Sequence, residues 1–325
     1  MKRRHLLGLG LAPMAAAWTA PARAGAWPER TLRLVVPYAP GGGPDVLTRQ
    51  YLPRVGKLLG QTVVVDNRVG AGGSIAAEHV AAQAPDGYSW LLGASTHVTQ
   101  KLLQPRLNFD PVRGFAHVTR LSFAPSLLVV SAASPYRSLQ DLVRAAHEQP
   151  GRLNYGSGGI GSAAHLAGAA LAQETGMNVA HIPYRGSVDL PGALAAGDVH
   201  FAVPTASTAL PLIRTGRLLP LAVTSAQRVP LLPNVPTLKE LVSSDDLVLV
   251  AWTGLWLPGG TPPAILRRLF EVHQAVYAQP DVVEAHAALG VTVSLSNSAS
   301  EFSEFVSAET AKYARIVKAS NIQLS

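Results

Sequence analysis

Short runs of β-branched and aliphatic residues alternate along the chain with longer segments whose apolar positions recur every three to four residues. The short runs predict strands at residues 31–36, 61–65, 89–92, 154–155, 179–182, 199–203 and 218–223. The longer segments predict helices at residues 45–59, 74–84, 138–147, 162–175, 263–278 and 299–319. This alternation indicates mostly parallel sheets flanked by helices, which bind ligands beyond the carboxyl ends of their strands.

The first 24 residues have the pattern of a secretory signal. Three basic residues at positions 2–4 precede an apolar stretch at 6–17, and Ala22-Arg23-Ala24 provides a small-x-small cleavage site. The apolar stretch is shorter than the roughly 20 residues that span a bilayer. We therefore expect cleavage after Ala24 and a periplasmic location, with the export route left open between general secretion and twin-arginine export.

Charge and cysteine content exclude several classes of function. Removing residues 1–24 takes away four positive charges and no negative one, so the formal net charge falls from +7 to +3. The remaining chain has no basic run, which argues against a nucleic-acid partner. Cysteine is absent, so neither disulfides nor cysteine-based metal or nucleophile chemistry is available. About 300 residues remain, enough for one or two packed domains.

Three glycine-rich turns stand just before predicted helices, at residues 40–45, 70–74 and 156–162. Glycine permits tight turns and close approach of a ligand to the backbone. The start of a helix offers unpaired N–H groups and a positive dipole end, which favour an anion. Each turn taken singly has a purely structural interpretation as well, but three in one chain favour anion binding.

Patterns typical of nucleotide binding and catalysis are missing. The third turn matches the spacing of a dinucleotide fingerprint, but no acidic residue follows at the distance where a ribose needs one. None of the turns ends in Gly-Lys-Ser/Thr, and no Gly-x-Ser-x-Gly elbow occurs. No histidine pair with an acid has metal-ligand spacing. We expect a binding protein without metal or cofactor, not an enzyme; a secreted hydrolase is the alternative of a different class.

An ordered series of short motifs resembles one known family. The series is Val35-Val36-Pro37, Pro40-Gly41-Gly42 with Asp45, Val65-Asp66-Asn67-Arg68, Gly70-Ala71-Gly72-Gly73, Pro85-Asp86-Gly87-Tyr88, Leu153-Asn154-Tyr155-Gly156-Ser157, His165-Leu166-Ala167-Gly168, His181-Ile182-Pro183-Tyr184-Arg185-Gly186, Ala222-Val223-Thr224-Ser225 and Pro233-Asn234-Val235-Pro236-Thr237. From residue 27 onward the chain is similar to the Bug, or TctC-like, periplasmic solute receptors of tripartite tricarboxylate transporters.

The resemblance implies a two-domain, hinged α/β fold of the second periplasmic-binding-protein type. Residues 25–124 and 225–325 would form domain 1, and residues 125–224 domain 2. A small carboxylate would bind between the domains, held by backbone amides and waters, and a membrane permease would receive it. A sensor kinase is the alternative partner, and a monomer is the expected state.

The same resemblance implies a set of ligand-binding residues. They are Tyr38, Ala39, Gly42, Gly43, Asp45, Ser95, Thr96, Ser157, Gly158, Gly161, Ser162, His165, Arg185, Gly186, Pro204 and Thr205. Two of these residues, His165 and Arg185, have an alternative position outside the binding cleft. His165 faces either the cleft or the core, and Arg185 is either a cleft residue or an exposed charge at a domain or permease contact.

Two departures from the family pattern concern the ligand. Where the family has Phe-Asp-Asn, this chain has Val203-Pro204-Thr205, and a second frequent acid falls on Ala193, with Asp189 one turn earlier. A carboxylate that can pair with a ligand ammonium group is therefore missing. We expect mono- or dicarboxylates without an amine to be preferred over amino acids.

Overall fold

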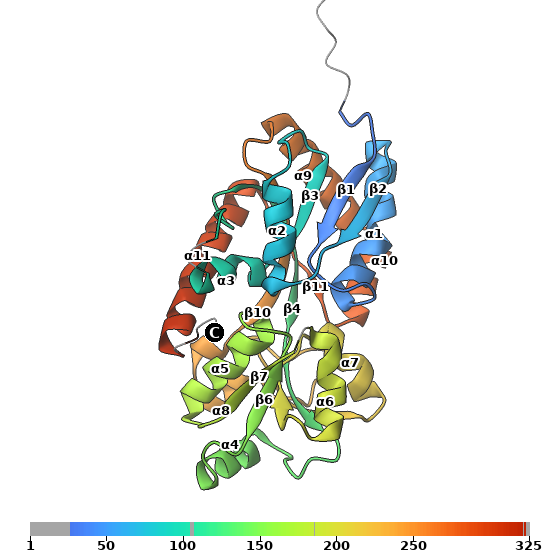
Figure 1. The fold of residues 1–325 in the computed structure, drawn as a ribbon. Coiled ribbons are helices and arrows are strands. Elements are labelled where there is room, and N and C mark those ends of the chain that lie inside the picture. Colours follow the sequence, from blue (N-terminus) through green and yellow to red (C-terminus); the bar gives the residue numbers. More distant parts are fainter. Residues whose placement is uncertain (1–26, 105–106, 185, 321, 323–325) are drawn as a thin grey trace, which may run out of the picture.

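The computed structural model describes residues 27–104, 107–184, 186–320 and 322. The expected signal at residues 1–24 lies outside this range. The described chain forms two lobes, each built on one sheet (Figure 1). In this part of the chain no helix combines the length and apolar character that a bilayer crossing requires.

The first lobe contains a six-stranded sheet with the order β11-β4-β10-β3-β1-β2. Its strands are β1 (Leu32–Val36), β2 (Val63–Asn67), β3 (Ser89–Ala94), β4 (Phe115–Pro125), β10 (Val250–Pro258) and β11 (Thr292–Val293). Its helices are α1 (Gly43–Leu59), α2 (Ser74–Ala81), α3 (Ser95–Leu103), α9 (Pro263–Tyr277), α10 (Pro280–Ala288) and α11 (Ala299–Ala319), with the short turn η1 (Ala71–Gly73) before α2.

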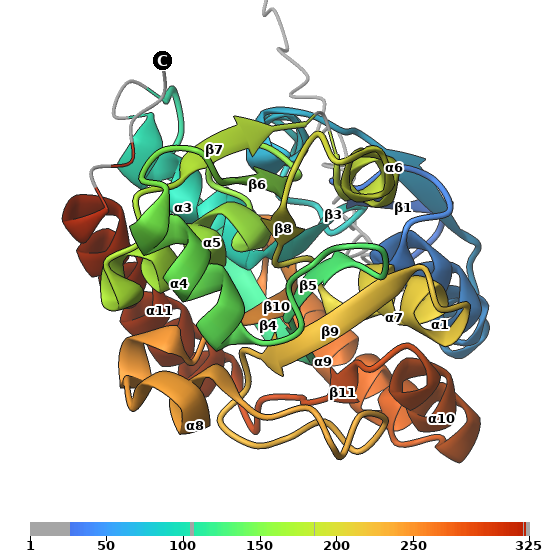
Figure 2. The same cartoon turned by 90° about the horizontal axis from the view of Figure 1, so that it is seen from below.

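The second lobe contains a five-stranded sheet with the order β7-β6-β8-β5-β9. Its strands are β5 (Leu127–Ser131), β6 (Asn154–Ser157), β7 (Ala180–Pro183), β8 (Phe201–Ala202) and β9 (Leu218–Val223). The helical segments are α4 (Leu139–Glu148), α5 (Ala163–Thr175), η2 (Ser187–Asp189), α6 (Leu190–Ala196), α7 (Ala206–Arg214), α8 (Leu238–Val242) and η3 (Asp245–Leu247). Figure 2 shows the helices of this lobe on both sides of its strands.

Alternation along the strands explains why each sheet is covered on both faces. In β1, Leu34 packs in the core beside α1 and α9, whereas its neighbour Val35 packs in the core of α2 and α11. In β5, Leu128 packs with α4 and α5, and Val129 packs with α6 and α7. Successive side chains of a strand point to opposite faces of the sheet. Because apolar residues occupy both sets of alternate positions, both faces must be covered by helices.

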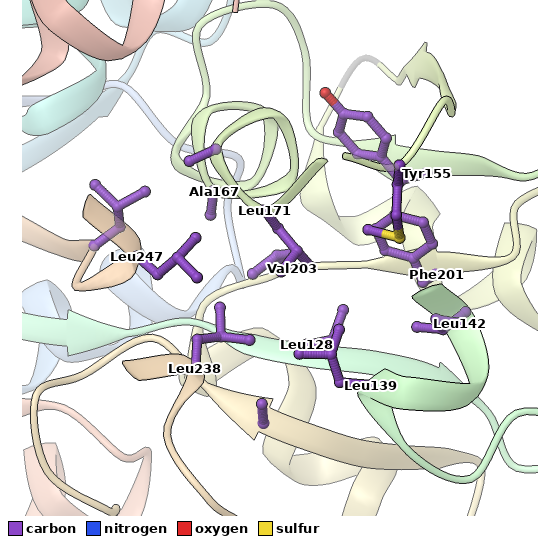
Figure 3. Packing of buried hydrophobic residues seen from close by; sticks show 14 of the residues in the cluster. Leu128, Leu139, Leu142, Tyr155, Ala167, Leu171, Phe201, Val203, Leu238 and Leu247 are labelled. Carbon is purple, nitrogen blue, oxygen red and sulfur yellow. The ribbon is translucent and has the colours of Figure 1, made fainter. Parts of the chain in front are cut away.

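The core of the second lobe also receives residues from outside its sheet. Figure 3 shows Leu238 and Leu247, which follow β9, on the side of Leu128 and Val203 that is away from Phe201, all within one cluster. The C-terminal helix α11 contributes to both lobes, because its Phe302 packs in the first lobe and its Tyr313 in the second. The expected domain boundaries at residues 124/125 and 224/225 remain a prediction.

Besides α11, two connections between the lobes lie side by side. β4 leads directly into β5 at Ser126, and β10 re-enters the first lobe after β9 and α8. Thr224 joins the two crossings, because its Oγ1 accepts a hydrogen bond from the Ser126 amide (2.9 Å) and its carbonyl accepts one from the Leu249 amide (3.0 Å). These connections are adjacent and bonded to each other, which is the arrangement expected of a hinge between two lobes.

The sheets are less uniformly parallel than we expected. β1 pairs in parallel with β2 and β3, and β6 pairs in parallel with β7 and β8. β10, by contrast, is antiparallel to both β3 and β4, and β5 is antiparallel to β8 and β9. The double crossing explains the pairs β4–β10 and β5–β9: a strand that leaves a lobe and a strand that enters it lie side by side and must run in opposite directions.

Candidate functional site

A cavity of about 740 Å³ lies between the two lobes. The first lobe supplies the loop after β1, the η1 turn, the start of α3 and parts of α1 and β10. The second lobe supplies the turn after β6, the segment around η2 and the start of α7. Its size falls in the range of small-molecule sites, roughly 300–1,000 Å³.

The proline-glycine loop before α1 forms one wall of the cavity. Tyr38, Ala39, Gly42 and Gly43 line it, and Gly42 is the N-cap of the helix. The first N–H groups of a helix have no acceptor within that helix. Pro44 has no N–H and the Gly42 amide already donates to the Ala39 carbonyl (3.1 Å), so this wall offers the Gly43 amide and the positive end of a 17-residue helix to an anion.

Asp45 holds this loop in place from behind the wall. Its Oδ2 accepts hydrogen bonds from the Gly41 amide (2.9 Å) and from Arg49 Nε (3.0 Å). Its Oδ1 accepts one from Asn67 Nδ2 (2.8 Å). Burial alone would raise the pKa of Asp45, but these three donors outweigh burial and hold the pKa below its usual value. Asp45 is thus an ionised support of the loop and does not line the cavity.

The turn after β6 forms the opposite wall. Gly158, Gly159, Ile160 and Ser162 line the cavity at the start of α5. Ser162 caps this helix, because its Oγ accepts a hydrogen bond from the His165 amide (3.3 Å). The second lobe therefore presents a helix start across the cavity from that of α1.

Two stacked histidines support this turn from behind. The rings of His165 and His181 lie 3.7 Å apart and are nearly parallel. His165 Nδ1 accepts a hydrogen bond from the Gly161 amide (3.0 Å), and His181 Nε2 lies 2.6 Å from Ser157 Oγ. Burial lowers the pKa of His165 to about 3, with a further contribution from His181, and burial lowers the pKa of His181 to about 4. Both imidazoles are neutral at pH 7, as their stacking requires.

The cavity wall contains ten of the sixteen residues expected from the sequence. These are Tyr38, Ala39, Gly42, Gly43, Ser95, Thr96, Gly158, Ser162, Gly186 and Thr205. The structure places five others behind the wall: Asp45, Ser157, Gly161, His165 and Pro204. Of the two alternatives for His165, the structure shows a buried residue that contacts the turn from behind. Arg185 lies outside the described residues. Ligand contact by any of these residues remains a prediction.

Sequence reasoning did not identify a large part of the lining. Among the missed residues are Leu47, Thr48, Tyr51, Gln100, Ser207, Thr208, Trp252, Tyr277, His286 and Val291. Gly70 and the η1 turn that follows it, which belong to one of the family motifs, also line the cavity. Helical spacing offered a signal only for Leu47 and Tyr51, which follow Gly43 on one side of α1 at four-residue intervals. The other positions come from elements far apart in the sequence.

The described lining is almost free of charge. It contains one carboxylate, Asp189, and no lysine or arginine. Burial lowers the pKa of His286 and raises the pKa of Tyr51 to about 12, so both are neutral at pH 7. Within the described residues no group of three or more His, Cys, Asp or Glu side chains is placed to hold a metal ion.

Known proteins resemble this chain over most of its length. The model of the tripartite tricarboxylate transporter family receptor (TctC) matches residues 47–322. The protein in the tcbD-tcbE intergenic region of Pseudomonas sp. (strain P51) is 38% identical over 291 residues, which cover 89% of this chain and 86% of that protein. BugT of Bordetella pertussis is 32% identical over 327 residues, covering 99% of this chain and 98% of BugT.

Solved structures agree with these relatives. The structure of R. palustris Rpa4515 with adipate has a TM-score of 0.86 at 32% identity, covering 91% of this chain and 99% of that chain. Periplasmic binding protein BugD has a TM-score of 0.84 at 30% identity, with the same coverage. They confirm the expected two-domain fold of the second periplasmic-binding-protein type. The chain belongs to the family of tripartite tricarboxylate transporter receptors, TctC, together with the Bug proteins.

Proposed function

We propose that this chain is an exported solute receptor that captures a small carboxylate lacking an amine between its lobes and delivers it to a tripartite tricarboxylate-type permease. One observation carries the proposal: helix starts from two different lobes, at Gly42–Gly43 and at Gly158–Ser162, line the same cavity. Backbone N–H groups at such positions attract a carboxylate without requiring a basic side chain.

The magnitude of this attraction explains why the receptor has two lobes. A helix start contributes about 0.3–1 kcal/mol to anion binding, and up to about 2 when partly buried. Micromolar binding requires about 8 kcal/mol. Two or three helix starts cannot supply this, so enclosure of the ligand by closing lobes must supply the rest. The adjacent crossings at Ser126 and Leu249 provide the hinge for this motion.

The two carboxylates in or behind the cavity wall support a preference for ligands without an amine. Asp45 is occupied by Gly41, Arg49 and Asn67, and is unavailable to a ligand ammonium group. Asp189 lines the cavity but is exposed, so solvent screens its charge. Binding without turnover fits the described lining, whose only carboxylate is that of Asp189.

The test is isothermal titration of the purified chain with acids that differ by one amino group. We expect hexanoate and adipate to bind at least tenfold more tightly than 2-aminohexanoate and 2-aminoadipate, respectively. Mass spectrometry after incubation should recover the ligand unchanged. Tighter binding of the amino acids would refute the preference for ligands without an amine. Conversion of the ligand would refute binding without turnover. Uptake that persists without the permease genes would refute delivery to the permease.

A further inference from the structure

Five apolar or aromatic residues of the first lobe line the cavity and are termed its apolar end: Leu47, Tyr51, Leu92, Tyr277 and Val291. Leu47 and Tyr51 lie one turn apart on α1, and the rings of Tyr51 and Tyr277 are 4.8 Å apart. Leu92 of β3 belongs to the same core cluster as these tyrosines. Each of the five residues is at most 7% exposed, so the apolar end is enclosed.

Several polar groups that line the cavity are bonded within the protein. The Thr48 hydroxyl donates to the Pro44 carbonyl (2.7 Å), and the hydroxyls of Ser122 and Thr253 bond each other (2.8 Å). His286 Nδ1 bonds the Val282 carbonyl (2.7 Å). The Tyr51 hydroxyl is buried, and the hydroxyls of Thr48 and Tyr277 are its polar neighbours. Neutral hydroxyls alone do not compensate the burial of a carboxylate.

We propose that the ligand is a monocarboxylate with an apolar hydrocarbon body, a proposal that rests on the carboxylate-receptor function above. Its carboxylate binds the helix starts, and its chain or ring occupies the apolar end. A second carboxylate there would be buried without a positive partner in the described lining, and such a charge is strongly unfavourable. Each methylene buried there instead raises affinity about fourfold.

This proposal separates the chain from the similar structure that holds adipate, a dicarboxylate. The closing experiment compares hexanoate with adipate, because both have six carbons and differ only in the second carboxylate. Isothermal titration of the purified chain should give a dissociation constant for hexanoate at least tenfold below that for adipate. Hexanamide, which lacks the charge, should bind at least tenfold more weakly than hexanoate.

Two variants locate the effect at the apolar end. Val291→Lys brings an ammonium group to this end and should shift the hexanoate-to-adipate preference at least tenfold toward adipate. Tyr51→Phe keeps the ring and removes only the hydroxyl, and should leave hexanoate affinity within about twofold. Circular dichroism checks that both variants fold. If Val291→Lys does not fold, the comparison of hexanoate with adipate in the wild-type chain still tests the proposal.

The outcomes distinguish this proposal from the general one. Equal or tighter binding of adipate by the wild-type chain would overturn the monocarboxylate proposal while leaving a carboxylate receptor intact. An unchanged preference in folded Val291→Lys would overturn the placement of the hydrocarbon body. Failure of hexanoate, adipate and shorter acids to bind at all would instead refute the proposed function.

Discussion

Closure of the lobes depends on a glycine at the start of α1. Gly43 of the first lobe lies against Ser207 of α7 in the second lobe, and a Cβ added at Gly43 would lie 2.6 Å from both Cβ and Oγ of Ser207. Real Cβ atoms do not approach other atoms this closely, so Gly43→Ala must displace one lobe from the other. Gly43 has a normal helical backbone, and alanine causes no backbone strain there.

The expected loss can be worked from this contact. Inserting one methyl group into a packed contact costs about 1–3 kcal/mol. If the cost falls on the closed state, ligand affinity decreases about 5- to 150-fold, since about 1.4 kcal/mol corresponds to tenfold. Stability measured without ligand should change less, because the open state relieves the contact. Isothermal titration with the best-binding carboxylate, together with urea unfolding, separates the two effects.

A second substitution tests the mechanism directly. Ser207→Gly removes the two atoms that the new methyl group would meet; the next atom, the Ser207 carbonyl carbon, is 3.8 Å away. The Gly43→Ala/Ser207→Gly pair should therefore recover most of the lost affinity. Gly192→Ala is the matched control, because a Cβ at that position meets nothing within 4 Å. Wild-type affinity in Gly43→Ala, or no recovery in the pair, would refute the closure argument.

Two further predictions concern buried titratable side chains. Asp45→Ala removes the acceptor of three hydrogen bonds, so the chain should lose about 1.5–3 kcal/mol of stability and bind ligand more weakly. The control Asp281→Ala, in the exposed pair with Arg54, should cost under about 1 kcal/mol of stability. Equal losses of stability in the two variants would contradict a special role for Asp45. Burial lowers the pKa of His273 to about 4, so the unfolded chain binds a proton that the folded chain does not between pH 6.5 and 4, and stability falls with falling pH in this window. His273→Phe should therefore reduce the drop between pH 7.5 and 5 by about 2 kcal/mol in urea unfolding. An undiminished drop would count against this assignment, and exposed His147→Phe serves as the control.

The sequence pattern predicted most of the regular elements, but it missed the strands that join the lobes. β4, β5, β10 and β11 were not among the expected strands, and β4 and β10 are the longest of these. Their pairing contains register shifts at Thr253/Gly254 and Leu255/Trp256, which interrupt the alternation that reveals a strand. β4 also carries Thr119, Arg120 and Ser122 in its middle, so its apolar pattern is weak. Both strands obtain their stability from neighbours in the sheet, which no local pattern records.

Short-range signals found the helix starts of the site because glycine and cap residues act within a few positions. Gly42 and Ser162 were predicted at the beginnings of α1 and α5, and both stand there as N-caps. The same motifs contain Asp45 and His165, which looked like ligand residues but lie behind the cavity wall. A motif indicates that a residue belongs to a site. It does not indicate whether the side chain points into the cavity or lies behind its wall.

By itself the sequence determined the alternating α/β pattern, the glycine-built helix starts and the family, because these depend on local conformation and on ordered motifs. The tertiary structure alone decided what the cavity is made of. Tyr51, Leu92, Tyr277 and Val291 are separated by up to 240 positions, and only the packing of α1, β3 and the end of α9 brings them to one apolar end. The positions of such residues follow from the whole fold, because side chains that meet across it share no local sequence pattern.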